Sequence, residues 1–571
     1  MRTSIPARIA ALLAAAVVAA ACTGDGEVRT DPPEGAPTVD DMAGDLGSDV
    51  VGALARGYHP DTSTDIAVVP MPGNTVVLWS GRGLGTDAAD PRTTHPTPWD
   101  YHQRVPIVFY APGRIAAGNA EGPVDITAIP RTLGFLAGAG FGGGPVLLDE
   151  RTFLDAPPKA IVTVVYDGGG WNLLERWPEA WPFLRRVMDR GLVYRNATIG
   201  SAPAVTTAIH ANIGTGVYPR THGLAEITGR LPDGSVGDLY FEEEADPRLL
   251  LVDTLGDRWD RENGNRAWVG MIGYEAWHLG MMSRGARAPG GDRDVAVLWR
   301  DEPGLGEFFV NEELYELPGY LPGEDDLRER LRGLDAEDGA VDGFWRGWDL
   351  EDPKVVPATP AFVEHQGAAL MEMIRREPIG EDGITDFLHV ELKPTDFGGH
   401  LWNMVAPEEE IVLRAQDDLL RSLVAALDRK LGRGEWVLAY TADHGQTPIP
   451  ETTGGVRIHP DILGRRIDEY FGRKIVQKVT PSGLFMNLEA LEAAGITLVD
   501  VARFVATYRY GDGLPADVDR SAIPRAELNR RVFAGALPAT YLAGLDEATT
   551  EGLGPGVYPE GDLTSPVPVP R

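Results

Sequence analysis

Four segments of the chain place metal-binding or nucleophilic side chains directly after apolar runs. These side chains belong to Asp167, Thr206, Thr207, Asp396, His400, Asp443 and His444. Carboxylates and imidazoles in two groups suit a pair of zinc ions, and other divalent metals would also fit. A hydroxyl beside two metal ions is an arrangement that transfers phosphoryl groups. The sequence therefore predicts a two-metal site with a threonine nucleophile.

Each of these four patterns is weak when it stands alone. Asp167 and the glycines after it could form only a turn, and Thr206 or Thr207 could simply cap a helix. Asp396 and His400 are one helical turn apart, a spacing that also arises by chance. The patterns gain weight together, because the carboxyl ends of parallel strands meet at one edge of a sheet.

Short apolar runs alternate with helical patterns along much of the chain, which predicts an α/β fold. The predicted strands are Val105–Tyr110, Ala160–Tyr166, Asp386–Leu392 and Trp436–Thr441, and the predicted helices include Pro182–Asp189 and Glu409–Lys430. We expect three α/β/α layers around a mostly parallel central sheet.

The four segments together resemble the alkaline phosphatase superfamily, and most closely its type I phosphodiesterase/nucleotide pyrophosphatase branch. The resemblance covers residues 160–230 and 385–446 and includes the loop Tyr218-Pro-Arg-Thr-His-Gly223. It implies one zinc ion on Asp167, Thr206, Asp443 and His444, and a second on Asp396, His400 and one further histidine. It also implies that Thr206 is the nucleophile, because Thr206 lies four residues before His210, with Thr207 as the alternative.

The further histidine is expected at His95, in the N-terminal part of the chain. The stretch Thr93-Thr-His-Pro-Thr-Pro98 and the following Arg104–Gly113 resemble the family's C-terminal segment, although Pro96 replaces its usual glycine. We therefore expect a circular permutation, which is tolerated where chain ends lie close together. A loop histidine without a metal role and ligation by His459 instead are the alternatives.

Two departures from the family bear on the substrate. The family's phosphoryl-binding asparagine falls here on Ile227, and the Lys-x-Arg pair of some monoesterases falls on Tyr274-Glu275-Ala276. Without those cations a dianionic phosphate monoester loses a charge-assisted contact, which favours a diester. A phosphomonoesterase and a non-catalytic metal-binding lipoprotein remain alternatives, as does a purely structural lipoprotein. Residue His278, in the same region, fits ordinary packing better than a place in a substrate pocket.

Composition excludes several classes of site and partner. Of the 571 residues, 52 are Lys or Arg and 85 are Asp or Glu, for a net charge of −33. This balance argues against a nucleic-acid-binding surface, which needs clustered Lys and Arg, so the expected partner is a small phosphate ester. The single cysteine, Cys22, excludes an intrachain disulfide and a thiolate zinc site.

The first residues resemble a bacterial lipoprotein signal. Arg2 and Arg8 precede an apolar run, and Ala19-Ala-Ala21 leads into Cys22 as the expected lipidation site. An exported protein cut nearby, with a free thiol, is the alternative. We expect an extracytoplasmic protein that meets the membrane through its lipid anchor only.

The expected organisation is a signal peptide (1–21), a tether (22–46), a permuted segment completing the catalytic domain (47–150), the catalytic core (151–230 and 376–460), a cap insertion (231–375), a second mixed region (461–550) and an irregular tail (551–571).

Overall fold

The computed structural model describes residues 46–77, 92–141, 145–148, 156–239, 245–300, 306–337, 339–516 and 518–545. All of them belong to one unit of the chain, Thr38–Arg571. The expected signal peptide, the lipidation site Cys22 and the tail 551–571 lie outside the described residues, as does the tether apart from its last residue.

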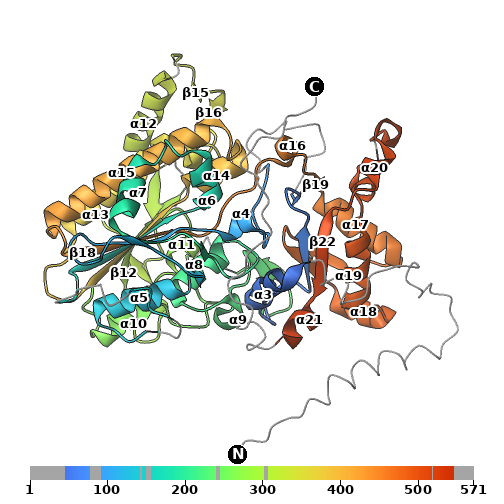
Figure 1. Ribbon diagram of the computed structural model, residues 1–571, viewed down its shortest axis with the longest axis horizontal. Helices are drawn as coiled ribbons and strands as arrows, with labels where there is room; N and C mark the ends of the chain where they lie inside the picture. The colour runs from blue at the N-terminus through green and yellow to red at the C-terminus, as the bar shows by residue number, and fades with distance from the viewer. Residues whose placement is uncertain are drawn as a thin grey trace, which may run out of the picture. The chain divides into compact units, whose positions relative to one another are not determined.

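Ten strands form the central sheet (Figure 1). Its order is β13-β12-β11-β17-β6-β18-β3-β7-β4, with β14 beside β12. The strands are β3 (Ile107–Tyr110), β4 (Gly118–Ala120), β6 (Ala160–Tyr166), β7 (Leu192–Tyr194), β11 (Val269–Gly273), β12 (Asp294–Arg300), β13 (Glu307–Phe309), β14 (Tyr315–Glu316), β17 (Asp386–Leu392) and β18 (Trp436–Ala442). The five strands from β12 to β18 are parallel to one another, whereas β3 joins β18 antiparallel.

The sequence predicted these central elements closely. Strands β6 and β17 have the predicted bounds, and β18 extends the predicted run by one residue. The reason is that these strands are buried throughout, so their sequences are continuous apolar runs. The predicted helices are α7 (Pro182–Arg190) and α15 (Pro407–Lys430).

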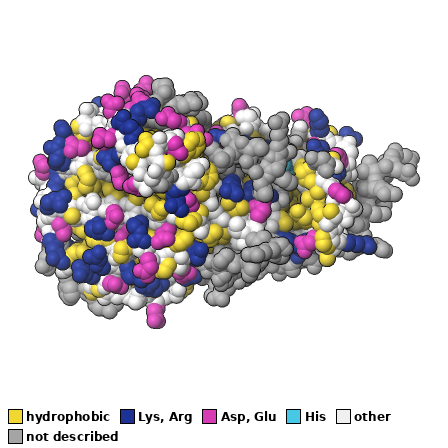
Figure 2. Space-filling view, turned by 90° about the horizontal axis from the view of Figure 1, so that it is seen from above, with side chains coloured by type: hydrophobic (Ala, Val, Ile, Leu, Met, Phe, Trp, Pro, Cys, Tyr) yellow, Lys and Arg dark blue, Asp and Glu magenta, His cyan; other side chains and the backbone are white. Residues whose placement is uncertain are grey.

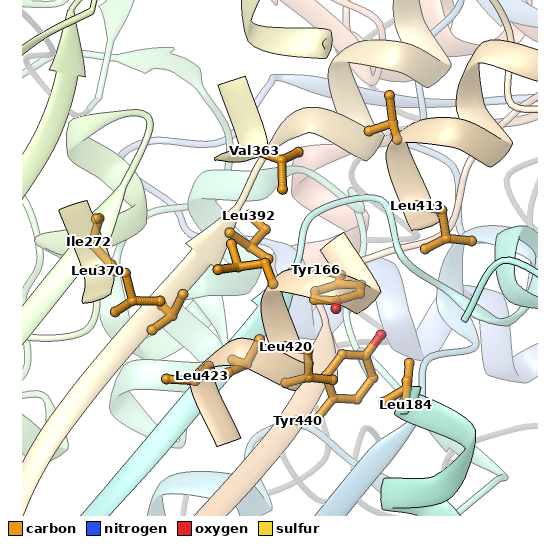
Figure 3. Close-up of a cluster of buried hydrophobic side chains, with 14 of the residues drawn as sticks. Tyr166, Leu184, Ile272, Val363, Leu370, Leu392, Leu413, Leu420, Leu423 and Tyr440 are labelled. Atoms are coloured by element: carbon orange, nitrogen blue, oxygen red, sulfur yellow. The ribbon is translucent and has the colours of Figure 1, made fainter. Parts of the chain in front are cut away.

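Helices cover both faces of the sheet. Side chains at alternate positions of β6 enter two different cores. In the first core, Val162 and Val164 pack with α7, α13 (Pro360–Arg376) and α15. In the second core, Ile161 and Val165 pack with α5 (Ala128–Ala137), α8 (Thr206–Thr215) and α10 (Leu255–Glu262). Figure 3 shows the first core, where Tyr166 and Tyr440 meet residues of α15. The alternation produces the three α/β/α layers expected from the sequence.

The segment 231–375 is not wholly the insertion expected from the sequence. Strands β11 and β12 lie beside β17 inside the central sheet, and α13 packs against α15 in the first core. The sequence of β11 is Val-Gly-Met-Ile-Gly. Its two glycines interrupt the apolar run, so the sequence did not predict this buried strand. The hairpin β15–β16 (Phe344–Trp345 and Trp348–Asp349) and α12 (Glu324–Glu337) lie off the sheet path and remain candidates for a cap.

A second, four-stranded sheet combines the two ends of the described chain. Its order is β20-β21-β1-β22, formed by Val476–Val479, Gly483–Met486, Ile66–Pro70 and Phe533–Pro538. Helices α17 (Pro460–Phe471) and α19 (Leu498–Thr507) share its apolar core. The N-terminal segment therefore contributes β1 to this sheet and β3 to the central sheet.

Acidic and basic side chains alternate over the face of the molecule drawn in Figure 2 rather than gathering by sign. Among the helices of the described residues, none is both long enough and apolar enough to cross a bilayer.

Candidate metal centre

The carboxyl ends of three neighbouring parallel strands carry most of the predicted ligands. Asp167 follows β6, Asp443 and His444 follow β18, and α14 (Pro394–Leu401) follows β17. Helix α14 holds Asp396 and His400 one turn apart. The sheet therefore brings these segments together, as the sequence predicted.

A tight turn brings Asp167 against α14. Gly168 has φ +68°, and a Cβ atom there would lie 3.1 Å from the Cα atom of Asp396. The Gly168 N–H also donates to Asp443 Oδ1, at 3.1 Å. Glycine is needed here both for the left-handed backbone and for the close approach of the two segments.

The first half-site comprises Asp167, Thr206, Asp443 and His444, all fully or almost fully buried. His444 Nε2 lies 3.3 Å from Asp167 Oδ1 and 3.2 Å from Asp443 Oδ2. Thr206 Oγ1 lies 3.5 Å from the same nitrogen. The structure thus gathers the four predicted side chains around one point.

The second half-site comprises His95, Asp396 and His400. His95 Nε2 lies 3.2 Å from Asp396 Oδ1 and 3.2 Å from His400 Nε2, and His400 Nε2 lies 3.3 Å from Asp396 Oδ2. The two half-sites adjoin, since the rings of His95 and His444 stack with centroids 3.6 Å apart. His400 is the most exposed of the three, with 21% of its side chain accessible.

Each of the three histidines is oriented by a backbone carbonyl. Nδ1 lies 2.8 Å from Ala204 O in His95, 2.6 Å from Thr93 O in His400 and 3.0 Å from Gly445 O in His444. A carbonyl only accepts, so Nδ1 carries the proton in each ring and Nε2 offers its lone pair to the centre. Fixing the tautomer in this way is the usual arrangement around metal-ligating histidines.

The geometry fits two tetrahedral metal ions. Zinc binds nitrogen and oxygen ligands at about 2.0–2.1 Å, which puts the ligand atoms about 3.3 Å from one another. The distances within both half-sites are 3.2 to 3.5 Å. Four buried carboxylate oxygens of the half-sites, Asp167 Oδ1, Asp443 Oδ2 and both oxygens of Asp396, receive no well-formed hydrogen bond from the described residues. Histidine Nε2 atoms lie 3.2 to 3.3 Å from these oxygens, so a cation between them would satisfy both.

The electrostatics of the first half-site favour a bound cation. Burial opposes a charge on His444, yet the Asp443 and Asp167 carboxylates outweigh burial and raise its pKa to about 10. Burial and the charge of Asp167 raise the pKa of Asp443 to about 6. In the second half-site, burial and the neighbouring His444 lower the pKa of His95 to about 4, which leaves its imidazole neutral. A proton on His444 thus takes the position that a metal ion would occupy.

One residue at the centre, Lys393, was missed by sequence analysis. It caps α14, directly after β17, and its ammonium Nζ lies 2.9 Å from Asp167 Oδ2 and 2.7 Å from Asp396 Oδ2. Burial disfavours its charge, but the two carboxylates raise its pKa well above the usual value. Only its place immediately after a buried strand gave a signal in the sequence.

His278 and Glu391 form a second missed contact, behind Asp167. The Glu275 backbone N–H donates to His278 Nδ1 at 3.0 Å, so Nε2 carries the proton and donates to Asp167 Oδ2 at 3.1 Å. Glu391, inside β17, lies 3.3 Å from His278 Nδ1. These three residues are close enough to hold an ion, but the tautomer of His278 makes it a hydrogen-bond donor that orients Asp167. The packing role expected for His278 from the sequence is therefore only part of its role, because His278 also donates a hydrogen bond to Asp167.

The two threonines of the nucleophile loop differ in their surroundings. Thr206 begins α8, and its Oγ1 lies near both His444 and Lys393. Thr207 Oγ1 is buried and forms no hydrogen bond with the described residues. The free N–H groups at the start of α8 favour an anion beside Thr206.

The remaining histidines of interest lie outside the two half-sites. His459, the alternative ligand, caps α17 beside β19 (Arg457–Ile458). His222 makes a structural hydrogen bond with Asn212, 2.9 Å away. His102 contacts Thr97, at 2.7 Å, and Thr447, at 2.5 Å, and so secures the loop that carries His95.

Next to Ile227, which stands at the asparagine position, lies a buried acid, Glu226. Burial raises its pKa to about 8, and Ser482 Oγ donates to its Oε1 at 2.5 Å. Glu226 lines a small cavity with Pro96, Pro98 and Pro203. It therefore supports the loops that carry His95 and Thr206 and is neutral near pH 7.

Comparisons with known proteins identify the family to which the chain belongs. The family model "Type I phosphodiesterase / nucleotide pyrophosphatase" matches residues 161–477. Alkaline phosphatase PhoV of Synechococcus elongatus is 25% identical over 342 residues, which cover 52% of this chain and 60% of that protein. A calcium-transporting ATPase of Myroides odoratus is 24% identical over 448 residues, covering 66% and 79%. The crystal structure of wild-type alkaline phosphatase PafA covers 68% of this chain and 85% of its own, with 19% identity and a TM-score of 0.48.

The chain spans about 60% of the length of PhoV in that match. The family match begins at residue 161, so His95 and β3 lie before it. The residues of the first half-site all lie within it.

Proposed function

The matched residues make up more than half of the chain, so the protein belongs to the type I phosphodiesterase/nucleotide pyrophosphatase family. On this premise we propose that it is a phosphoric ester hydrolase and that it cleaves phosphate esters through Thr206 at a centre of two zinc ions. The observation that carries the proposal is the position of Thr206 Oγ1, next to His444 Nε2 of the first half-site and Lys393 Nζ.

The two half-sites supply the ligands for this centre. Asp167, Thr206, Asp443 and His444 would hold one ion, and His95, Asp396 and His400 would hold the other. When bound, the ions lower the pKa of the threonine hydroxyl and stabilise the charge on the leaving oxygen. Asp167, Asp396 and Asp443 balance the charge of the ions, and the carbonyls behind the three histidines keep each Nε2 directed inward.

Thr206 is the nucleophile in this mechanism. Its hydroxyl proton passes to solvent, and its oxygen forms a bond to phosphorus while the bond from phosphorus to the ester oxygen breaks. The leaving alcohol takes up a proton from solvent. The enzyme then carries the phosphoryl group on Thr206, and water restores the free hydroxyl by releasing phosphate from a monoester substrate or a phosphate monoester from a diester. Thr206 is the first residue of α8, and the N-terminus of a helix stabilises negative charge placed beside it.

The physiological substrate and the location belong to the proposal as well. The absence of the family's asparagine and Lys-x-Arg cations favoured a diester, whereas the alkaline phosphatase relatives favour a monoester. We also propose export and lipid anchoring through Cys22, on the sequence of the first 22 residues alone.

The experiment compares turnover by zinc-loaded wild-type protein with turnover by Thr206→Ala, with Thr207→Ala as the matched control. The substrates are an aryl phosphate monoester and the corresponding methyl diester. We expect Thr206→Ala to lose about 10³-fold or more in kcat/KM, and Thr207→Ala to keep most of its activity. Full turnover by Thr206→Ala would contradict the mechanism. No turnover by wild-type protein that has bound two metal ions would favour the non-catalytic binding lipoprotein.

A further inference from the structure

Lys393 is a buried cation between the two half-sites. Only 6% of its side chain is exposed, and each of its two ion pairs goes to a different half-site: Asp167 Oδ2 at 2.9 Å and Asp396 Oδ2 at 2.7 Å. An isolated charge this deeply buried is costly unless it is paired, so these contacts fix the position of Nζ.

The remaining donor of the ammonium group points toward the nucleophile. A lysine Nζ has three N–H donors. One donates to Asp167 Oδ2, and the contact with Asp396 Oδ2 is an ion pair. Nζ also lies 3.4 Å from Thr206 Oγ1, a long contact for a hydrogen bond. A phosphoryl group bound to that oxygen would place a nonbridging oxygen closer to Nζ than Oγ1 itself lies. Nζ is therefore poised for an oxygen that arrives with the substrate.

The surroundings of Nζ limit the other uses of this donor. Nζ lies over the ring of Phe397, 5.6 Å from its centroid, so an apolar surface covers one side of the charge. The segment Tyr274-Glu275-Ala276, where some relatives have Lys-x-Arg cations, instead donates two backbone N–H groups to Glu391 and His278. The cation at this centre thus comes from the end of β17 and not from the end of β11.

We propose that Lys393 binds a nonbridging oxygen of the phosphoryl group transferred to Thr206, and that this contact makes phosphate monoesters the preferred substrates. The inference rests on the proposed function. A monoester brings two negative charges to the centre and a diester one, so a fixed cation stabilises the transfer from a monoester more strongly. The expected diester preference assumed that no such cation lies at the centre, whereas Lys393 Nζ lies between the two half-sites.

Lys393→Met tests the assignment, because methionine keeps much of the length of lysine and removes the charge. We expect wild-type protein to prefer the aryl monoester over the methyl diester with the same leaving group. Lys393→Met should bind two metal ions per chain, lose about 10²–10³-fold in kcat/KM for the monoester and lose less than about tenfold for the diester. Inhibition by inorganic phosphate should weaken in parallel. Lys393→Arg, which keeps a cation, should retain most of the preference.

Lys478→Met is the matched control, since Lys478 is a surface lysine of β20 that contacts Thr228. It should change neither substrate nor metal content. Equal losses for both esters in Lys393→Met, or loss of bound metal, would mean that Lys393 only holds the ligand carboxylates, and either result would overturn the proposal. A wild-type preference for the diester would overturn it too. If Lys393→Met does not fold, Lys393→Gln is judged by the same results. Failure of the proposed function is recognised separately, by turnover that does not depend on Thr206.

Discussion

The first half-site takes all of its ligands from residues 161–477, the part of the chain that matches the family, whereas the second half-site takes His95 from a segment before it. Asp167, Asp443 and His444 sit at the ends of adjacent parallel strands, so the sheet itself fixes their spacing. His95 lies in a loop, and its position depends on contacts with Ala204 and on the packing of β3 against β18. The sheet thus positions the proposed ligands of the first half-site, whereas tertiary contacts of a distant segment position the proposed ligand His95.

The largest expected effect comes from Asp443→Asn in the first half-site. The change removes a carboxylate charge next to His444 and Thr206, so we expect the loss of one metal ion and a fall in kcat/KM of about 10³-fold or more. Metal analysis and aryl phosphate turnover check this. Asp417→Asn, which changes a carboxylate that accepts hydrogen bonds from the start of α7, is the control for stability. Two bound ions and near-normal turnover in Asp443→Asn would contradict the proposal that the first half-site binds a catalytic metal ion.

The elements around the first half-site were largely predictable from the sequence, because continuous apolar runs mark buried strands and ligand-type residues follow them directly. His95 was found only through its resemblance to a segment that the family carries elsewhere. Lys393 and Glu391 were not found, and His278 was expected only to pack, since the roles of all three depend on contacts between β6, β17 and the end of β11 that no local pattern records. The glycines of β11 also concealed a central strand in the region expected to be an insertion.

His95→Ala tests whether the two half-sites bind metal separately. We expect this variant to keep the metal ion of the first half-site and lose that of the second, with kcat/KM lower by about 10²–10³-fold. His459→Ala, the change at the alternative ligand, should keep both ions and full activity. Restoration of activity to His95→Ala by added imidazole would support a ligand role for the His95 side chain. Two ions bound as tightly as in wild-type protein would show that His95 is not a ligand of the second half-site.

His278→Ala addresses the support behind the first half-site. His278 donates to the oxygen of Asp167 that faces away from His444, so its loss frees the carboxylate to rotate. We expect metal affinity or activity to fall by about 10–100-fold. Zinc titration against a competing chelator measures this. His222→Ala is the control, because His222 is also buried but contacts Asn212. An unchanged zinc affinity in His278→Ala would show that the hydrogen bond from His278 to Asp167 does not support metal binding.

Glu226→Gln has the smallest expected effect and concerns the loop that carries His95. The folded state raises the pKa of Glu226 from 4.5 to about 8, chiefly through burial, so between these values the folded protein holds a proton that the unfolded chain releases. Wild-type stability should therefore fall as pH rises from 4.5 to 8. The glutamine variant lacks this dependence and should be more stable at pH 8, by an amount of the order of a few kcal/mol. Melting temperatures across this range check the prediction, and parallel curves for the two proteins would contradict it.

The most direct test of the central claim is to quench the zinc-loaded enzyme in acid during turnover of an aryl phosphate and to locate the phosphoryl group by mass spectrometry. We expect a phosphoryl group on Thr206, present during turnover and absent without substrate. A phosphoryl group on Thr207, or a burst of released alcohol with no phosphorylated residue, would contradict it.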